Sequence, residues 1–149
     1  MAIKERISYV IPVAFTHDPS GTPVLVYEFD EWNGEADISF GVFFIGLRAE
    51  KEYLVTIDVV SEDGGETLVD VNSNIFNNKR LVRVSKAHDG ESIVSASIKV
   101  NFNNVKVNKH GIFQVRASLT DIGLQKVISI ANSFFDIKPA GIIRDEFRQ

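Results

Sequence analysis

The chain has 149 residues, of which 44% are hydrophobic and 24% charged, with a formal net charge of −4 and no cysteine. The missing cysteine excludes disulfides, thiolate metal sites and cysteine nucleophiles, and the acidic balance argues against general attraction to nucleic acid. This length suits one domain with its own core, so we expect a single domain over residues 1–149.

The N-terminal region carries no targeting or membrane signal that we can identify. Charged residues open the chain without a long apolar run behind them, and Pro12 interrupts the next apolar stretch. No segment approaches the ~20 apolar residues that a membrane helix needs. We therefore expect no membrane association and a cytoplasmic location, which the lack of disulfides also fits.

The first two strands are predicted at residues 7–15 and 24–29. Pro12 marks the first as an edge strand or the site of a bulge. Turn-forming residues fill positions 17–23, so we expect the two strands to close a hairpin.

The next strand, residues 38–47, is apolar on both of its faces. A strand of this kind is central in its sheet, or its second face is covered by a partner. It therefore predicts self-association. One face would carry Ile38, Phe40, Val42 and Phe44, and the other Phe43, Ile45 and Leu47.

The middle of the chain alternates over residues 53–59 and then reaches the turn signal at 62–65. Gly-Gly supplies the positive φ angles of a tight turn, so residues 66–71 should return as a hairpin. Residues 72–92 are less regular, and we expect a long loop with a short edge strand near 81–84.

Strict two-residue alternation marks the strands at 94–102 and 113–119, and a last strand is predicted at 126–137. Alternation puts one apolar face inward and one polar face to water. In the last strand the apolar parity shifts, which predicts a β-bulge near residues 131–133. The tail from 142 to 149 could form a helical turn or dock on the body.

These strands predict an all-β, antiparallel β-sandwich of about eight or nine strands, with phenylalanines between the sheets. Gly111 and Phe113 resemble the start of strand F in immunoglobulin-like domains, although Phe113 lacks the hydroxyl of a tyrosine corner and Val115 replaces the usual cysteine. The block 111–137 also resembles the last hairpin of small bacterial and phage-borne sandwich proteins of unknown function. This resemblance implies a fold and no activity.

Two clusters are candidate contact sites. Asp30 and Glu31 precede Trp32 in an acidic loop, which could bind calcium through carboxylates or be a solvated turn. Trp32 could be an exposed contact residue or cap one end of the core. A basic cluster could hold a phosphate or an acidic partner, or be a solvated loop. It consists of Lys79, Arg80, Arg83 and Lys86.

Catalytic signals are weak. His17, His88 and His110 each lie beside turn residues, and a metal site would need them to converge with carboxylates. No nucleophile elbow, phosphate loop or dinucleotide fingerprint is present, so we expect no enzyme and no cofactor.

The expected function is protein–protein interaction or assembly, as in an accessory or structural protein of the phage or mobile-element type. Its partner would be a protein or a second copy, bound through sheet edges and loops. One alternative is a carbohydrate- or small-ligand-binding module, with Trp32, Tyr27 and Tyr53 as stacking rings. The other is a hydrolase whose pocket gathers histidines and carboxylates.

Overall fold

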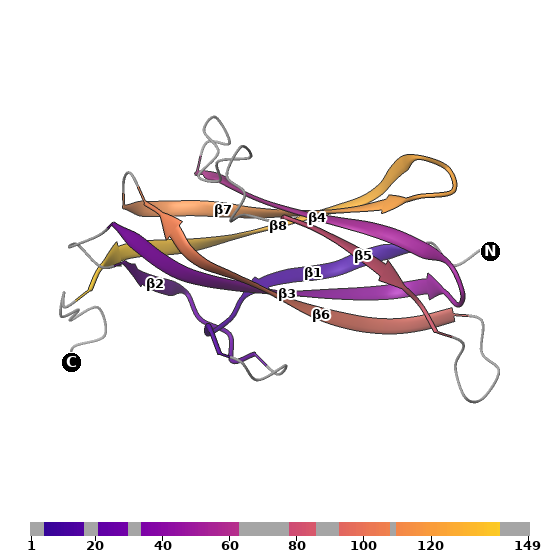
Figure 1. The fold of residues 1–149 in the computed structure, drawn as a ribbon, viewed down its shortest axis with the longest axis horizontal. Helices are drawn as coiled ribbons and strands as arrows, with labels where there is room; N and C mark the ends of the chain where they lie inside the picture. The colour runs from indigo at the N-terminus through magenta and orange to yellow at the C-terminus, as the bar shows by residue number, and fades with distance from the viewer. Residues whose placement is uncertain are drawn as a thin grey trace.

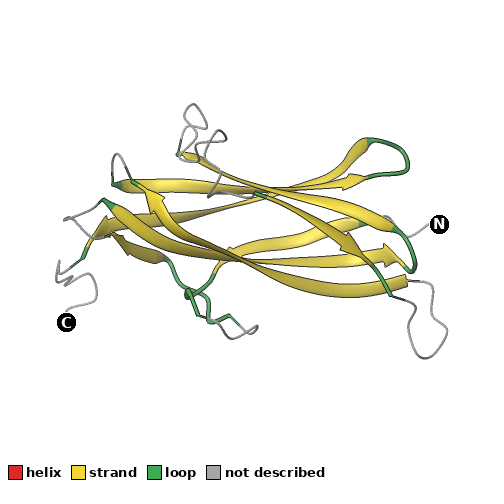
Figure 2. Cartoon of the chain, viewed as in Figure 1, coloured by secondary structure: helices red, strands yellow, loops and turns green. Residues whose placement is uncertain are grey.

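The computed structural model describes six stretches of the chain: residues 5–16, 21–29, 34–62, 78–85, 93–107 and 110–140. These residues form eight strands and no helix (Figure 2). The strands are β1 (Arg6–Pro12), β2 (Val26–Phe29), β3 (Glu35–Arg48), β4 (Glu52–Ser61), β5 (Lys79–Arg83), β6 (Ile93–Lys106), β7 (Gly111–Asp121) and β8 (Lys126–Pro139).

The strands form two sheets that pack face to face (Figure 1). The three-stranded sheet has the order β1-β3-β6, and the five-stranded sheet has the order β2-β8-β7-β4-β5. Immunoglobulin domains place strands A, B and E in one sheet and strands G, F and C in the other. The strand orders match this arrangement when β1, β3 and β6 are taken as strands A, B and E, and β8, β7 and β4 as strands G, F and C. The predicted all-β sandwich is confirmed.

The predicted first hairpin is wrong. β1 pairs with β3, whereas β2 lies in the other sheet and runs parallel to β8 from Val26 to Phe29. Between them, the described residues pair at the bridge of Val13 with Pro23, flanked by the backbone hydrogen bonds of Ala14 with Thr22 and of Val24 with Pro12. β1 and β2 therefore belong to different sheets, and the pair of β2 and β8 is parallel.

Phenylalanine fills the space between the sheets, as the composition predicted. Phe40 and Phe135 lie at the centre, with ring centroids 5.4 Å apart. Tyr27 packs edge-on against Phe135 at 5.5 Å, and Phe113 stacks on it at 6.2 Å. Each of these four side chains is at most 5% exposed. Phe113 therefore occupies the core, in keeping with its lack of a hydroxyl group.

Alternation correctly predicts the inward face of the strands at the middle of the sandwich. Val55, Ile57 and Val59 of β4 are fully buried, and so are Val115, Ala117 and Leu119 of β7. β3 lies between β1 and β6, which confirms the central position predicted for residues 38–47. The short edge strand predicted near 81–84 is β5.

Bulges change which face of the sheet a side chain points to, and one such bulge was predicted at the wrong position. In β8 the pairing steps from Ser129 to Val127 against Leu119 and Thr120, so the extra residue is Ile128. The bulge predicted near 131–133 is wrong, because these residues pair in regular register with Ala117, Arg116 and Val115 of β7. Ile130 faces outward and is 58% exposed, so the shift in apolar parity arises at Ile128. The predicted hairpin at 62–71, most of the loop at 72–92 and the tail at 142–149 lie outside the described residues.

None of the described residues belongs to a helix long and apolar enough to cross a membrane.

Candidate functional site

An apolar patch lies on the outer face of the three-stranded sheet. Tyr9 of β1 stacks on Phe43 of β3, with ring centroids 4.6 Å apart and the ring planes at 27°. Tyr9 is 49% exposed and Ile45, next along the outer face of β3, is 45% exposed. We call this surface the outer-face patch, and it comprises Ser8, Tyr9, Phe43, Ile45, Ser95 and Ser97.

Two bulges create the outer-face patch. In β1 the register shifts between Ile7 and Tyr9, so both Ser8 and Tyr9 face outward. In β3 the register shifts between Phe44 and Leu47, where Gly46 has a φ of 76°. A positive φ is the conformation that glycine adopts readily at a bulge. This bulge turns Leu47 into the core, whereas simple alternation placed it on the outer face.

The outer-face patch is hollowed and carries no charged side chain. An open hollow of about 350 Å³ lies over it, with Phe44 and Ala96 also in its lining. Ser8, Ser95 and Ser97 also line the hollow. An apolar surface lined also by serines is suited to a macromolecular contact or to a flat polar ligand.

A second apolar surface follows β8 on the outer face of the five-stranded sheet. Val127, Ile130 and Phe134 of β8 and Ile112 of β7 are each about half exposed, between 48% and 58%. The polar pair Arg116 and Asn132 interrupts this surface, since Asn132 lies between Ile130 and Phe134. We call it the β8 row and treat it as the competing contact surface.

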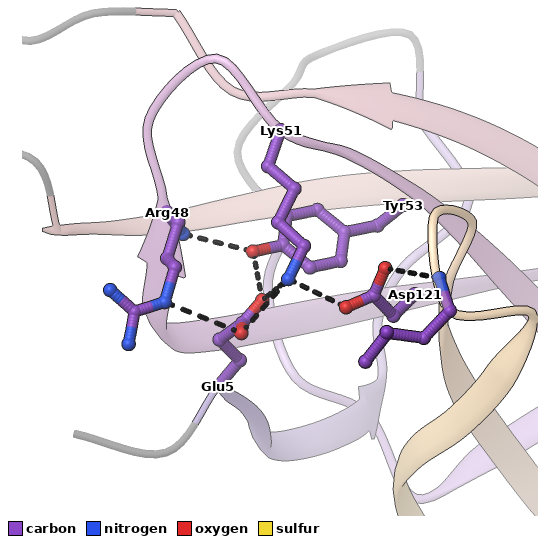
Figure 3. A network of polar contacts seen from close by, with 6 residues as sticks. Glu5, Arg48, Lys51, Tyr53 and Asp121 are labelled. Atoms are coloured by element: carbon purple, nitrogen blue, oxygen red, sulfur yellow. Dashed lines mark hydrogen bonds and ion pairs between the residues drawn. The ribbon is translucent and has the colours of Figure 1, made fainter. Parts of the chain in front are cut away.

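Charged and polar groups gather at one end of the sandwich, around the turn between β3 and β4, where the side chain of Asp121 is 2% exposed and that of Lys51 is 30% exposed (Figure 3). The Lys51 Nζ atom lies 2.6 Å from Asp121 Oδ2 and 3.1 Å from both carboxylate oxygens of Glu5. Arg48 Nε lies 3.5 Å from Glu5 Oε1. We call these residues, together with Tyr53, the Lys51 network.

Tyr53 anchors the Lys51 network to the core. Its side chain is fully buried, its hydroxyl accepts a hydrogen bond of 2.9 Å from the Arg48 N–H, and it donates one to Glu5. A tyrosine hydroxyl bonded to backbone a few residues upstream is what a tyrosine corner provides in immunoglobulin domains, here supplied from β4. Burial, followed by the bond to Glu5, raises the pKa of Tyr53 to about 12.

Opposite charges set the titration of the central pair. The hydrogen bond to Asp121 holds the pKa of Lys51 above its ordinary value. The same bond holds the pKa of Asp121 below its ordinary value, against the effect of burial. Both directions favour the charged forms of the two side chains at neutral pH.

The predicted contact residues that the structure describes do not line the outer-face patch. Lys79, Arg80 and Arg83 lie along the edge strand β5, with Lys79 and Arg83 exposed. Charged side chains on a short edge strand discourage the edge from pairing with other chains. Asp30, Glu31, Trp32 and Lys86 lie outside the described residues.

The histidines and tyrosines considered as metal ligands or sugar-binding rings form no such site in the described part of the chain. His110 stacks on Phe29 with centroids 6.3 Å apart, whereas His17 and His88 lie outside the described residues. In the described part of the chain, no group of three or more His, Asp or Glu side chains could hold a metal ion. Tyr27 and Tyr53 are 5% and 0% exposed, so neither is the stacking ring that a carbohydrate site needs.

Sequence analysis missed Tyr9 and the Lys51 network. Tyr9 belongs to a predicted strand, and an outward aromatic there could have been found by pairing it with the outward Phe43. The Lys51 network had no such signal, because Glu5, Lys51 and Asp121 are far apart in the sequence.

Comparisons with known proteins agree with the fold. No protein-family model matches the chain, and no curated protein matches it. A bacterial adhesin from Mobiluncus mulieris, containing intramolecular disulfide, isopeptide and ester bond cross-links, is similar with a TM-score of 0.57 at 11% identity, over 91% of this chain and 58% of that one. A Bacteroides uniformis β-glucuronidase is similar with a TM-score of 0.52 at 10% identity, over 88% of this chain and 14% of that one. At these identities the likeness shows the β-sandwich fold alone.

Proposed function

We propose that this protein is a non-enzymatic assembly module that associates with a second copy of itself through the outer-face patch. The stacked Tyr9–Phe43 pair on an exposed, hollowed sheet face is the observation that carries the proposal. Exposed aromatic and aliphatic side chains with a polar rim are the usual centre of a protein contact.

The charge distribution favours a second copy as the partner. The whole chain carries a net charge of −4, so two copies repel each other at most orientations. The lining of the outer-face patch contains only neutral side chains, so two copies related by a two-fold axis can meet there with the charged Arg6, the exposed cross-strand partner of Ile45, at the edge of the contact.

The fold does not choose between contact and catalysis, since similar sandwiches occur in an adhesin and in a glucuronidase chain. An accessory role of the phage or mobile-element type remains our expectation. A cytoplasmic location is compatible with a chain that has no cysteine to oxidise.

The test is the solution mass by light scattering over a wide concentration range, with a matched pair of variants. We expect the wild type to reach a dimer and Ile45→Ser to remain a monomer. Ile130→Ser is the control, because Ile130 is equally apolar and at least as exposed, but lies in the β8 row. A wild type that stays monomeric would overturn the proposal, as would a dimer lost only in Ile130→Ser.

A second candidate function is carbohydrate binding at the same surface. It is favoured by one observation: the exposed Tyr9 ring lines the same hollow as Ser8 and Ser97. Sugar faces stack on such rings while hydroxyls bind their edges. A glycan screen on monomeric Ile45→Ser and on Tyr9→Ala tests it, since binding should survive the first change and be lost in the second.

A further inference from the structure

The Lys51 network places one amine between two carboxyl groups. Lys51 Nζ contacts Asp121 Oδ2 at 2.6 Å on one side and both Glu5 oxygens at 3.1 Å on the other (Figure 3). The side chain of Asp121 is 2% exposed and that of Glu5 is 14% exposed. We propose that Lys51 and Asp121 condense to an intramolecular isopeptide bond, with Glu5 carrying the proton.

The acceptor carboxyl group is held for attack. Asp121 Oδ1 accepts a hydrogen bond of 3.2 Å from the Leu124 N–H, while Oδ2 faces Lys51. A backbone N–H on Oδ1 stabilises the negative charge that develops on that oxygen when a nucleophile adds to the carbon. Oδ2 is therefore the oxygen that leaves.

The backbone fixes the two reacting groups beside each other. Tyr53 and Asp121 are cross-strand partners at the end of the β4–β7 pair. Lys51 stands two residues before Tyr53, and side chains two residues apart in an extended chain point to the same side. The Tyr53 ring lies 5.5 Å from Lys51 Nζ and forms a buried, apolar wall beside it. The reaction thus requires reorientation of groups already in contact, which removes most of the entropic cost of bringing them together.

The proposed reaction balances without any other reactant. The Lys51 ammonium passes one proton to Asp121 Oδ2, giving a neutral amine and a carboxylic acid. The nitrogen lone pair adds to Asp121 Cγ, and the nitrogen gives a second proton to the Glu5 carboxylate. Glu5 then releases that proton to solvent, and the departing Oδ2 hydroxyl takes up one proton from solvent and leaves as water, so that an amide remains and the protons balance.

The charges around the pair make the reaction slow. The pKa of Lys51 is raised and that of Asp121 is lowered, so the neutral amine and acid are a minor form of the pair. The cross-link should therefore accumulate over time in the folded protein. It would covalently join the residue before β4 to the last residue of β7.

Intact mass spectrometry of the denatured full chain tests the proposal. After prolonged incubation of the folded protein at neutral pH, we expect a species lighter than the sequence by one water molecule. Proteolysis should then yield a branched peptide that joins Lys51 to Asp121. Glu5→Gln, which keeps the size of the side chain but removes the proton carrier, should form this species more slowly.

Lys51→Arg is the matched control, because it keeps the positive charge beside Asp121 but removes the primary amine. A wild type that retains its full mass would overturn the proposal whether or not the variants fold. Loss of water in Lys51→Arg to the same extent as in the wild type would also overturn it, because dehydration would then arise from an aspartyl succinimide elsewhere.

Discussion

Removing the hydroxyl of Tyr53 should destabilise the protein, although the ring stays in place. In Tyr53→Phe the Arg48 N–H loses an acceptor at 2.9 Å, and Glu5 loses a donor. Depriving such a group of its partner costs about 1–3 kcal/mol, and because the two partners of the hydroxyl, Arg48 and Glu5, are partly exposed, the cost should lie near the lower end, about 1–2 kcal/mol. For a domain of this size the loss corresponds to a fall of about 2–8 °C in Tm.

The effect should also depend on pH. The pKa of Tyr53 is raised to about 12 in the folded protein, whereas an unfolded tyrosine titrates near its ordinary value of about 10. A raised pKa contributes stability that is complete below the unfolded value and is lost as the pH rises through the folded one. The difference between wild type and Tyr53→Phe should therefore be constant at neutral pH and shrink above about pH 10.

Urea denaturation at several pH values measures both effects, with intact masses recorded so that only chains in the same cross-linking state are compared. Tyr9→Phe is the control, because Tyr9 is 49% exposed and the same change there should alter stability by less than about 0.5 kcal/mol. If Tyr53→Phe were no less stable than Tyr9→Phe at neutral pH, the role given to the Tyr53 hydroxyl would be wrong.

Two further predictions test the core and the β5 edge. Phe135→Ala should lower the free energy of unfolding by about 3–5 kcal/mol, while the same change at the adjacent, outward Phe134 should cost less than about 1 kcal/mol. Urea midpoints measure both, and equal losses would contradict the assigned faces. Replacing Lys79 and Arg83 by valine should speed aggregation without lowering Tm, because the edge loses its charges. Turbidity on standing checks this, and unchanged aggregation would remove the protective role.

Alternation was sufficient to predict the frame of the sandwich. Val55 in β4 and Val115 in β7 are inward and fully buried, as their parity requires. A side chain in a regular strand needs only its neighbours to define its face, which is why this part of the fold could be read locally.

Bulges and long-range pairing could not be read in this way. The parity of Leu47 depends on the extra residue at Gly46, and that of Ile130 on the extra residue at Ile128. A bulge is defined by the partner strand, which the local sequence does not name. The parallel pairing of β2 with β8 has the same origin.

The candidate sites show the same limit. The apolar surplus of residues 38–47 pointed to a contact surface, and Phe43 and Ile45 do lie in the outer-face patch. Its aromatic partner Tyr9 comes from β1, and the Lys51 network joins Glu5, Lys51 and Asp121 from three separate segments. Such groupings follow from topology, so residue spacing along the chain gives no indication of them.

Site-specific disulfide trapping tests the proposed assembly most directly, because the chain has no cysteine of its own. Ser97→Cys places a single thiol at the rim of the outer-face patch, and Asn132→Cys places one at an exposed position in the other sheet. Under mild oxidation we predict a covalent dimer of Ser97→Cys at protein concentrations where Asn132→Cys stays monomeric. Equal dimer yields from the two variants, or a dimer from Asn132→Cys alone, would contradict assembly through the outer-face patch.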